Sequence, residues 1–264
     1  MKTLILLIIS FPLFLTQETI AQENPVTIKV LSYNIHYGVG MDSKKDLSRI
    51  AKVIKQVKPD IVGLQEISDS IMTVELSELT NMIAVFGPSK EEMSGYGDAI
   101  LSKYPLKYVG NHSIPSASSS RYEAMCVDID LSQVYGKGST VRFINTHFDW
   151  LNTIGSKVAR KGAVEVIETA FFTDSLNYPS LLTGDLNATP DSNPLKLLQK
   201  NGWVYEDFDK DLFTIPVVNP KIQIDYVLIR PTKRWHIISV KVIDEPMASD
   251  HLPILMTLEL LSEE

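Results

Sequence analysis

Apolar and polar residues alternate at every second position in several stretches of the chain, a pattern typical of strands that bury one face. The first stretch, Val26–Tyr33, ends at Asn34, and Asp60–Leu64 is a shorter apolar run that leads into Gln65 and Glu66. The predicted strands are Val26–Tyr33, Asp60–Leu64, Tyr96–Ser102, Lys107–Ile114, Glu123–Leu131, Thr140–His147, Leu181–Leu182, Ile222–Ile229, Ile237–Ile243 and Leu252–Leu260.

Apolar residues at helical spacing predict the connecting helices. Asp46 has the residue type of an N-cap, apolar residues recur through Leu47–Val57, and Pro59 ends that helix. Further helices are predicted over Ile71–Met82, over Lys157–Phe172 and from Asn193 onward. Strand–helix–strand units thus mix with strand–strand meanders, and two packed sheets with helices outside is the economical fold for that order.

Polar side chains stand where the predicted strands begin or end. Asp250 and His251 come directly before the last apolar strand, and such a pair suits a site at a sheet edge better than a core. The other polar residues at strand ends are Asn34, Glu66, His147, Asp185 and Asn187. Loops at the ends of a rigid scaffold usually carry the chemistry of a protein, so a site is expected where these ends meet.

The first residues have the pattern of a secretory leader. Lys2 is followed by the apolar stretch Leu4–Leu15, and Ala21 stands at a small-residue cleavage point. Residues 1–22 are therefore expected to be a signal peptide, and residues 23–264 a single secreted or periplasmic domain, because no linker or repeat divides them. An uncleaved anchor is the alternative, although the apolar run is short for a membrane span.

The formal net charge is −7, and Cys126 is the only cysteine. Cys126 lies in an alternating run and is expected to be buried in a strand. An acidic surface does not suit sequence-blind binding to long nucleic acid, which favours a basic stripe. Catalysis on nucleic acid stays open, because a bound divalent metal inverts the local field. We expect a monomer without a stable membrane span.

Seven short motifs follow one another along the chain: Ser32 to Asn34, Asp60 to Glu66, Gly97 to Ser102, Asn145 to His147, Gly184 to Asn187, Asp225 to Leu228 and Ser249 to His251. In this order they resemble the endonuclease/exonuclease/phosphatase superfamily, which includes DNase I, apurinic endonucleases, neutral sphingomyelinases and inositol-polyphosphate 5-phosphatases. The resemblance covers nearly the whole of residues 23–264. It implies a four-layer α/β sandwich, with two mixed, mostly antiparallel sheets packed face to face and helices outside.

The resemblance also implies a hydrolase that cleaves a P–O bond with a divalent cation, Mg²⁺ or Mn²⁺. Such hard cations prefer oxygen ligands. The implied metal ligands are Asn34, Glu66, Asp185 and Asp250, with Glu66 the principal one. His36 stands where some relatives carry a second acidic ligand, so the number of metal ions stays open.

The implied catalytic residues are His147, Asp185, Asn187, Asp225 and His251. His251 would be a general base or a second acid, with Asp225 orienting its ring, since a lone Asp entering an apolar strand needs a partner. Whether Asp185 or His251 takes the proton stays open. By resemblance to DNase I, His147 lies on the side of the leaving group. Asp98 is a candidate partner for His147, and Asp149 either helps to place that ring or is simply solvated.

Substrate contacts are expected from Asn34, Arg121 and Asn187, and an apolar wall against a base or ring from Tyr37, Phe148 and Trp150. Each also has a structural interpretation: Asn34 is equally a turn residue, and Arg121 an ordinary surface cation. The chain has few insertions, no aromatic hairpin for membrane docking and no basic helix for duplex DNA.

These features favour a secreted phosphodiesterase that acts on small or exposed phosphodiesters, with nucleic acid or a phospholipid head group as candidate partners. An endonuclease and a phosphomonoesterase for inositol or sugar phosphates are the alternatives. An inactive binding protein on the same fold is disfavoured by the intact set of polar residues. A serine hydrolase is disfavoured because the chain has no Gly-x-Ser-x-Gly turn.

Overall fold

The computed structural model describes residues 26–89, 96–136, 138–172, 178–205 and 212–262. The expected signal peptide, residues 1–22, lies outside the described residues. None of the helices within the described part of the chain has the length and hydropathy needed to cross a bilayer.

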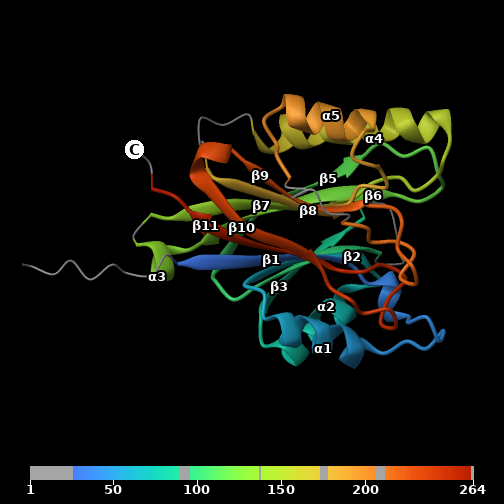
Figure 1. Ribbon diagram of the computed structural model, residues 1–264, viewed down its shortest axis with the longest axis horizontal. Helices are drawn as coiled ribbons and strands as arrows, with labels where there is room; N and C mark the ends of the chain where they lie inside the picture. The colour runs from blue at the N-terminus through green and yellow to red at the C-terminus, as the bar shows by residue number, and fades with distance from the viewer. Residues whose placement is uncertain (1–25, 90–95, 137, 173–177, 206–211, 263–264) are drawn as a thin grey trace, which may run out of the picture.

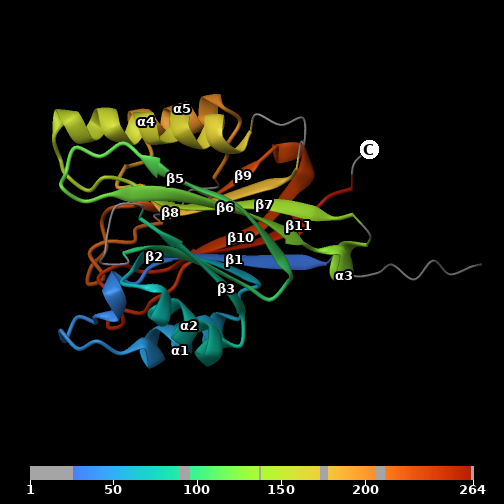
Figure 2. The same cartoon turned by 180° about the vertical axis from the view of Figure 1, so that it is seen from behind.

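Two β-sheets pack face to face, and helices cover both outer faces (Figures 1 and 2). One sheet has the strand order β10-β11-β1-β2-β4-β3, the other the order β5-β6-β7-β8-β9. The strands are β1 (Thr27–Asn34), β2 (Ile61–Ile67), β3 (Ile83–Pro88), β4 (Gly97–Ser102), β5 (Leu106–Ile114), β6 (Tyr122–Asp130), β7 (Thr140–His147), β8 (Ser180–Asp185), β9 (Asp225–Arg230), β10 (Trp235–Val242) and β11 (Ile254–Leu260).

The main helices lie on opposite sides of the sandwich, α1 and α2 beneath the six-stranded sheet and α4 and α5 above the five-stranded one (Figures 1 and 2). The helices are η1 (His36–Gly38), α1 (Leu47–Val57), α2 (Ser70–Thr80), the short α3 (Ser132–Tyr135), α4 (Ile154–Phe171), α5 (Asn193–Lys200) and η2 (Thr232–Arg234). The expected four-layer α/β sandwich is therefore confirmed.

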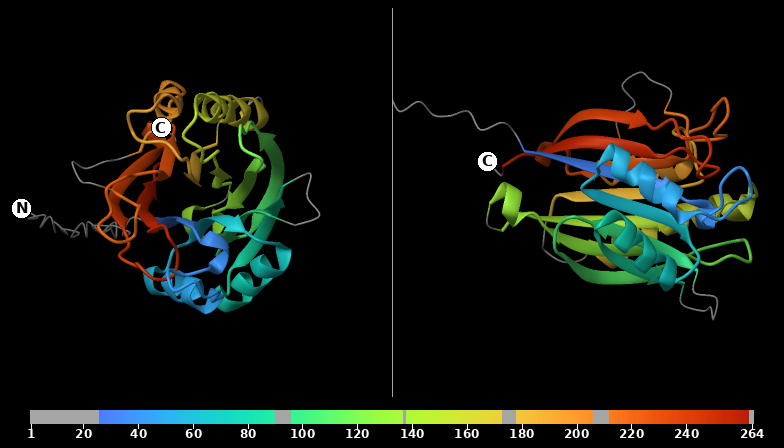
Figure 3. Two further views of the ribbon diagram at one scale, coloured as in Figure 1. Left: turned by 90° about the vertical axis from the view of Figure 1, so that its right-hand side faces the viewer. Right: turned by 90° about the horizontal axis from the view of Figure 1, so that it is seen from below.

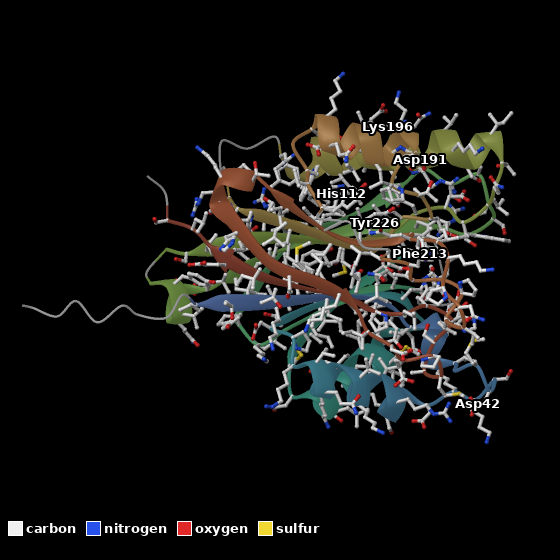
Figure 4. All side chains as sticks on the ribbon, viewed as in Figure 1. Asp42, His112, Asp191, Lys196, Phe213 and Tyr226 are labelled. Atoms are coloured by element: carbon white, nitrogen blue, oxygen red, sulfur yellow. The ribbon has the colours of Figure 1, made fainter. Side chains whose placement is uncertain are left out.

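Three apolar layers hold the four structural layers together. The central layer joins the two sheets through buried side chains such as Val30, Phe143 and Met256. A second lies between the five-stranded sheet and helices α4 and α5, and a third between the six-stranded sheet and helices α1 and α2. Figure 4 shows side chains filling these spaces, while Lys196 on α5 points outward. Burial of these layers is the main contribution to the stability of the fold.

The residues at the two ends of α1 cap the helix as the sequence predicted. The carboxylate of Asp46 accepts a hydrogen bond from the backbone N–H of Ser48, which satisfies one of the unpaired N–H groups of the first turn. Lys58 closes the helix in a left-handed conformation before Pro59. The apolar face of α1, which includes Ile50 and Ile54, packs onto the six-stranded sheet.

Two elements were not expected from the sequence. β3 is an edge strand with one buried residue among six, so its sequence lacks the alternation of a half-buried strand. The single turn of α3 lies between the predicted strands Glu123–Leu131 and Thr140–His147, where no helix was predicted. The final strand of the five-stranded sheet also begins later than expected, at Asp225 instead of Ile222.

A polar network crosses the middle of the sandwich. Asn145 on β7 donates hydrogen bonds to the carbonyl oxygens of Leu64 and Ala99 in the opposite sheet, and its Oδ1 accepts one from Gln65. Gly63 allows this close approach: a Cβ there would lie 2.5 Å from Oδ1 of Asn145. The two sheets are thus tied by specific polar contacts in addition to apolar packing.

The topology brings several strand ends to one end of the sandwich. β1 runs parallel to β2, with Asn34 opposite Gln65, and β7 runs parallel to β8, with His147 opposite Asp185. β9 is antiparallel to β8 and begins at Asp225, directly opposite Asp185. The loops that follow β1, β2, β7 and β8, and the segment that leads into β9, lie at the right in Figure 1 and face the viewer in the left panel of Figure 3.

Candidate active site

The buried carboxylate of Asp185 lies at the centre of the site. Its Oδ2 lies 3.1 Å from Nδ2 of Asn34, 3.4 Å from Nε2 of His147 and 3.7 Å from Nε2 of His251. Its Oδ1 accepts a hydrogen bond from the backbone N–H of Asn187. The structure therefore brings together residues from both sheets that are up to 217 positions apart, as the sequence analysis expected.

His251 is held from two sides. Nδ1 of its ring lies 2.9 Å from Oδ2 of the buried Asp225, the partner expected from the sequence. Its backbone N–H donates to the hydroxyl of Ser249, which in turn donates to the carbonyl oxygen of Asn34. The imidazole is thereby fixed with Nε2 toward Asp185.

His147 occupies the opposite side of Asp185. The phenol of Tyr96 lies 3.2 Å from Nδ1 of this imidazole, and Nδ2 of Asn187 lies 3.2 Å from Nε2. The ring of Tyr122 packs edge-on against it, with ring centroids 4.9 Å apart. Tyr96 was missed by sequence reasoning, because an aromatic residue at the start of an apolar strand gives no signal of a polar partner.

Asn34 links Glu66 to Asp185: its Nδ2 donates to Oε1 of Glu66 at 3.0 Å and to Oδ2 of Asp185 at 3.1 Å. Glu66 has a left-handed backbone, with φ of 61°, at an irregularity in the pairing of β2 with β4. Asn187 is also left-handed, with φ of 46°. Such conformations are costly for residues other than glycine and are typical of functional sites.

Asp250 is more exposed than the buried Asp185 and Asp225. One of its oxygens lies 3.4 Å from the hydroxyl of Ser249 and 3.8 Å from Nδ1 of His36. The hydroxyl of Ser249 also donates to the backbone carbonyl of Asn34. Asp250 is therefore next in sequence to the residue that ties this loop to β1. His36 belongs to a strained turn with φ of 45°.

The donor set fits a hard cation. The carboxylates of Glu66 and Asp185 converge on one amide nitrogen of Asn34, so a positive charge is favoured at that point. Asp185, Asp225 and His251 also form a cluster whose ligand atoms lie within 4.8 Å of one another. In that cluster the short contact between Asp225 and Nδ1 of His251 is already a hydrogen bond, which suits proton transfer better than metal binding.

The charges of the site shift the pKa values of both histidines upward. Burial alone would lower the pKa of His251, but the carboxylates of Asp225 and Asp185 outweigh it and raise that pKa to about 10. Burial also acts to lower the pKa of His147. The carboxylates of Asp185, Glu66 and Asp98 outweigh it and raise that pKa to about 9. The reciprocal attraction of the two imidazoles outweighs burial and lowers the pKa of Asp185.

Asp98 lies beside His147 without replacing Tyr96 as its partner. It is buried, its Oδ2 has no hydrogen-bond partner among the described residues, and it acts on His147 through charge. Burial raises the pKa of Asp98 to about 7, and the positive charge of His147 opposes that rise. The expected pairing is therefore electrostatic only.

Asp149 has a role that neither sequence interpretation included. It is fully buried, and its Oδ2 accepts hydrogen bonds from the hydroxyl of Ser116 and from the backbone N–H groups of Ala117 and Ser118. It thereby anchors the serine-rich loop before β6. Arg121, at the end of that loop, is exposed, and its contact with a phosphate stays a prediction.

The expected apolar wall is correct only in part. Phe148 is fully buried in the layer beneath α4 and α5, because its side chain points into the sandwich. Tyr37 and Trp150 are exposed, by 39% and 60%. Tyr37 packs against Tyr96, with ring centroids 5.8 Å apart, which brings an aromatic surface to the side of the site where His147 lies.

Comparison with known proteins agrees with this geometry. A family model described as the endonuclease/exonuclease/phosphatase family matches residues 31–251, which span the site from β1 to His251. No curated protein matches the chain. Among solved structures, an endonuclease/exonuclease/phosphatase from Bacteroides vulgatus is 20% identical with a TM-score of 0.72, covering 89% of this chain and 100% of that chain.

Two further structures share the fold at low identity. The mannosyl-6-phosphatase of Bacteroides thetaiotaomicron is 18% identical, has a TM-score of 0.69 and covers 89% of this chain and 100% of that chain. The human Nocturnin catalytic domain, solved with a bound sulfate anion, is 19% identical, has a TM-score of 0.67 and covers 90% of this chain and 97% of that chain. Given the span of the family match, the chain belongs to the endonuclease/exonuclease/phosphatase family.

Proposed function

We propose that this protein is an exported phosphodiesterase that depends on a divalent metal ion. The observation that carries the proposal is the position of Asp185 between two imidazoles, each with its own partner: Asp225 for His251 and Tyr96 for His147. Hydrolysis of a phosphate ester needs a group that takes a proton from water and another that gives one to the leaving oxygen. Two fixed imidazoles flanking one carboxylate meet that need.

On one side, Asp185 receives the proton of the attacking water beside the charged imidazole of His251. Oδ2 of Asp185 and Nε2 of His251 lie 3.7 Å apart, so one water can contact both. Asp225 holds Nδ1 of the imidazole and stabilises its charged form, and the pKa of about 10 leaves little neutral imidazole at neutral pH. The proton therefore passes to the ionised Asp185, and the imidazolium of His251, oriented by Asp225, donates to the water or to a phosphate oxygen.

On the other side, His147 protonates the leaving oxygen. Tyr96 contacts Nδ1, Oδ2 of Asp185 lies 3.4 Å from Nε2, and the carboxylates around the ring favour the imidazolium form. The amide of Asn187 also donates to the carbonyl oxygen of Phe148, which limits its rotation. Asn34, Asn187 and Arg121 are the groups assigned to the phosphate.

Glu66, Asp185 and Asp250 would hold the metal ion, and Asn34 would join them only if its amide turned, because its Nδ2 faces the carboxylates while its Oδ1 accepts the backbone N–H of His36. When bound there, Mg²⁺ or Mn²⁺ would supply positive charge to offset that of the phosphate and would polarise water. The carboxylates of Glu66 and Asp185 require such a cation, because without it they repel an anionic substrate.

The excess of carboxylates favours a diester as substrate. Glu66, Asp98, Asp185, Asp225 and Asp250 all lie at this end of the sandwich. A phosphodiester carries one negative charge, whereas a monoester carries close to two at neutral pH, so these carboxylates repel a diester less. A phosphomonoesterase is the second candidate, because a mannosyl-6-phosphatase shares the fold.

Hydrolysis of a matched pair of substrates tests the proposal. An aryl phosphodiester and the corresponding monoester would be assayed with Mg²⁺, with Mn²⁺ and with a chelator, beside the variant His251→Ala. Diester cleavage that needs both the metal ion and His251 is expected. Cleavage of the monoester alone would establish the second candidate instead, and metal-independent cleavage by the variant would refute the assignment.

Export is part of the same proposal and rests on the leader pattern of residues 1–22. N-terminal sequencing of the protein recovered from its native cell fraction is the test. A mature terminus near Ala21 is expected, and a terminus at Met1 would contradict export by a cleaved leader.

A further inference from the structure

The N-terminal half of α4 has an inverted pattern of burial. It buries the polar Ser156 and Arg160, while Ile154 and Val158 are 83% and 66% exposed. The second half is conventional, with the apolar Val164, Ile167 and Phe171 buried. A helix on the surface of a sheet normally turns its apolar side chains inward, so the first two turns need a separate explanation.

Arg160 explains why the polar side is buried. Its Nη1 donates to the carbonyl oxygens of Asp149 and Leu151, which bracket Trp150. The carboxylate of Asp149 also accepts the backbone N–H of Leu151. These contacts fix the turn before α4 with the indole outward, and Trp150 is 60% exposed.

Ile154 and Val158 stand four positions apart on α4, so they lie on one face of the helix. With the exposed Trp150 in the turn before α4, they form what we name the apolar ridge. Lys157 and Lys161 are exposed on the same side of α4, because they follow Ile154 by three and seven positions. Lys161 lies 3.5 Å from Glu165, one turn further along the helix.

The apolar ridge begins close to the candidate active site. Trp150 is three residues after His147, and α4 starts at the end of the sandwich where the site lies (Figure 1; Figure 3, left). Gly155, in the first turn of α4, packs against Ala117 in the loop anchored by Asp149. A surface that touches the apolar ridge therefore also lies near the leaving-group side of the site.

We propose that the apolar ridge docks on an anionic phospholipid bilayer. Tryptophan and aliphatic side chains favour the boundary between head groups and acyl chains, and lysines beside them bind anionic head groups. On a chain with a net charge of −7, Lys157 and Lys161 give the apolar ridge a cationic border that complements such a surface. Together with the proposed function, on which this part rests, docking makes the phosphodiester of a phospholipid head group the substrate class.

Intrinsic fluorescence provides a direct test of docking. The chain has three tryptophans, and Trp203 and Trp235 are buried, so a change on addition of vesicles reports on Trp150. Full-length mature protein, with His251→Ala to prevent turnover, would be mixed with phosphatidylcholine vesicles with and without phosphatidylglycerol. A blue shift and sedimentation with the anionic vesicles only, weakened by salt, is expected.

Variants separate the apolar from the electrostatic contribution. Ile154→Ser/Val158→Ser should abolish the blue shift and sedimentation, and Lys157→Gln/Lys161→Gln should weaken binding about fivefold per lysine. The matched controls are Ile83→Ser/Ile238→Ser, which removes exposed apolar side chains elsewhere, and Lys52→Gln/Lys55→Gln, which makes the same change of charge on α1. Both controls should bind like the parent protein.

Turnover of the soluble aryl phosphodiester distinguishes this inference from the proposed function. With active protein, Ile154→Ser/Val158→Ser should retain that turnover and lose only cleavage of phospholipid in vesicles. Absence of vesicle binding by the parent protein would overturn the docking proposal while leaving soluble turnover intact. Self-association that disappears in the same double variant would instead identify the apolar ridge as a contact between two copies.

Discussion

Nδ1 of His251 lies 2.9 Å from Oδ2 of Asp225, and this contact joins two strand ends that are 26 positions apart. Both side chains are largely buried, so water cannot replace either partner. The pair therefore fixes both the position of the imidazole and the nitrogen that faces Asp185.

The first prediction concerns this pair. Asp225→Asn keeps the shape of the side chain but removes the charge that stabilises the imidazolium, so kcat on the aryl phosphodiester should fall about 10²- to 10⁴-fold. KM should change little, since Asp225 contacts His251 and not the substrate. Steady-state kinetics at saturating metal ion provides the measurement. Wild-type kcat in a variant with unchanged circular dichroism would remove Asp225 from the mechanism.

The second prediction separates the two histidines by the leaving group. If His147 protonates the leaving oxygen, His147→Ala should reduce kcat about 10²- to 10⁴-fold for a diester with an alkyl alcohol as leaving group. With a nitrophenol, which leaves without protonation, the loss should be roughly tenfold or less. His251→Ala serves as the comparison, because its loss should be similar for both substrates. Equal losses for His147→Ala on the two substrates would place His147 in another role.

The third prediction concerns the metal ion. Glu66→Gln removes one of the two carboxylates that converge on Asn34, so the affinity for Mn²⁺ should fall about 10- to 100-fold. Isothermal titration calorimetry measures this without any need for turnover. The control is Glu75→Gln on the exposed side of α2, which makes the same change of charge away from the site. Identical Mn²⁺ affinity in the two variants would exclude Glu66 as a ligand.

The fourth prediction concerns stability and pH. The pKa of Asp98 is about 7 in the folded protein, because burial favours the neutral form, and about 4 in the unfolded chain. Between pH 4 and pH 7 the carboxyl of Asp98 binds more protons in the folded state than in the unfolded chain. The contribution of Asp98 to the free energy of unfolding therefore falls as the pH rises. Asp98→Asn cannot ionise and should therefore be about 1–3 kcal/mol more stable than the parent at pH 8, with no gain at pH 4.

Urea unfolding with chelator at both pH values tests this sign. The control Asp191→Asn, at an exposed position in the loop before α5, should show no gain at pH 8. A parent protein whose difference from Asp98→Asn is the same at pH 4 and pH 8 would show that Asp98 does not carry a raised pKa.

Much of the site followed from residue type and place in the sequence. Glu66, Asp185 and His251 stand directly at strand ends, so a sheet that brings those ends together also brings the residues together. Tyr96 and Asp149 could not be assigned in the same way. The first contacts His147 from the opposite sheet, and the second is a carboxylate that the serine-rich loop before β6 encloses. Both roles depend on packing between distant segments.

The elements of the fold also divide into those that the sequence pattern predicts and those that depend on packing. β1 and α1 lie within a residue of the ranges expected, because their burial follows the period of a strand or a helix. β3 was missed because it is a mostly exposed edge strand. The first half of α4 was expected to be ordinarily amphipathic, and only the contacts of Arg160 with two carbonyl oxygens reveal that its polar side is the buried one.

The hydrogen bonds of Asn145 reach across from one sheet to the other directly beneath the site, and Asn34 joins Glu66 of one sheet to Asp185 of the other. Neither half of the sandwich contains a complete catalytic set. A partly folded chain in which each sheet has formed but the two have not docked would thus be inert, and activity would appear only after the two sheets have docked. The protein is expected to cross a membrane before it folds. With this arrangement, phosphoester cleavage would begin only after export.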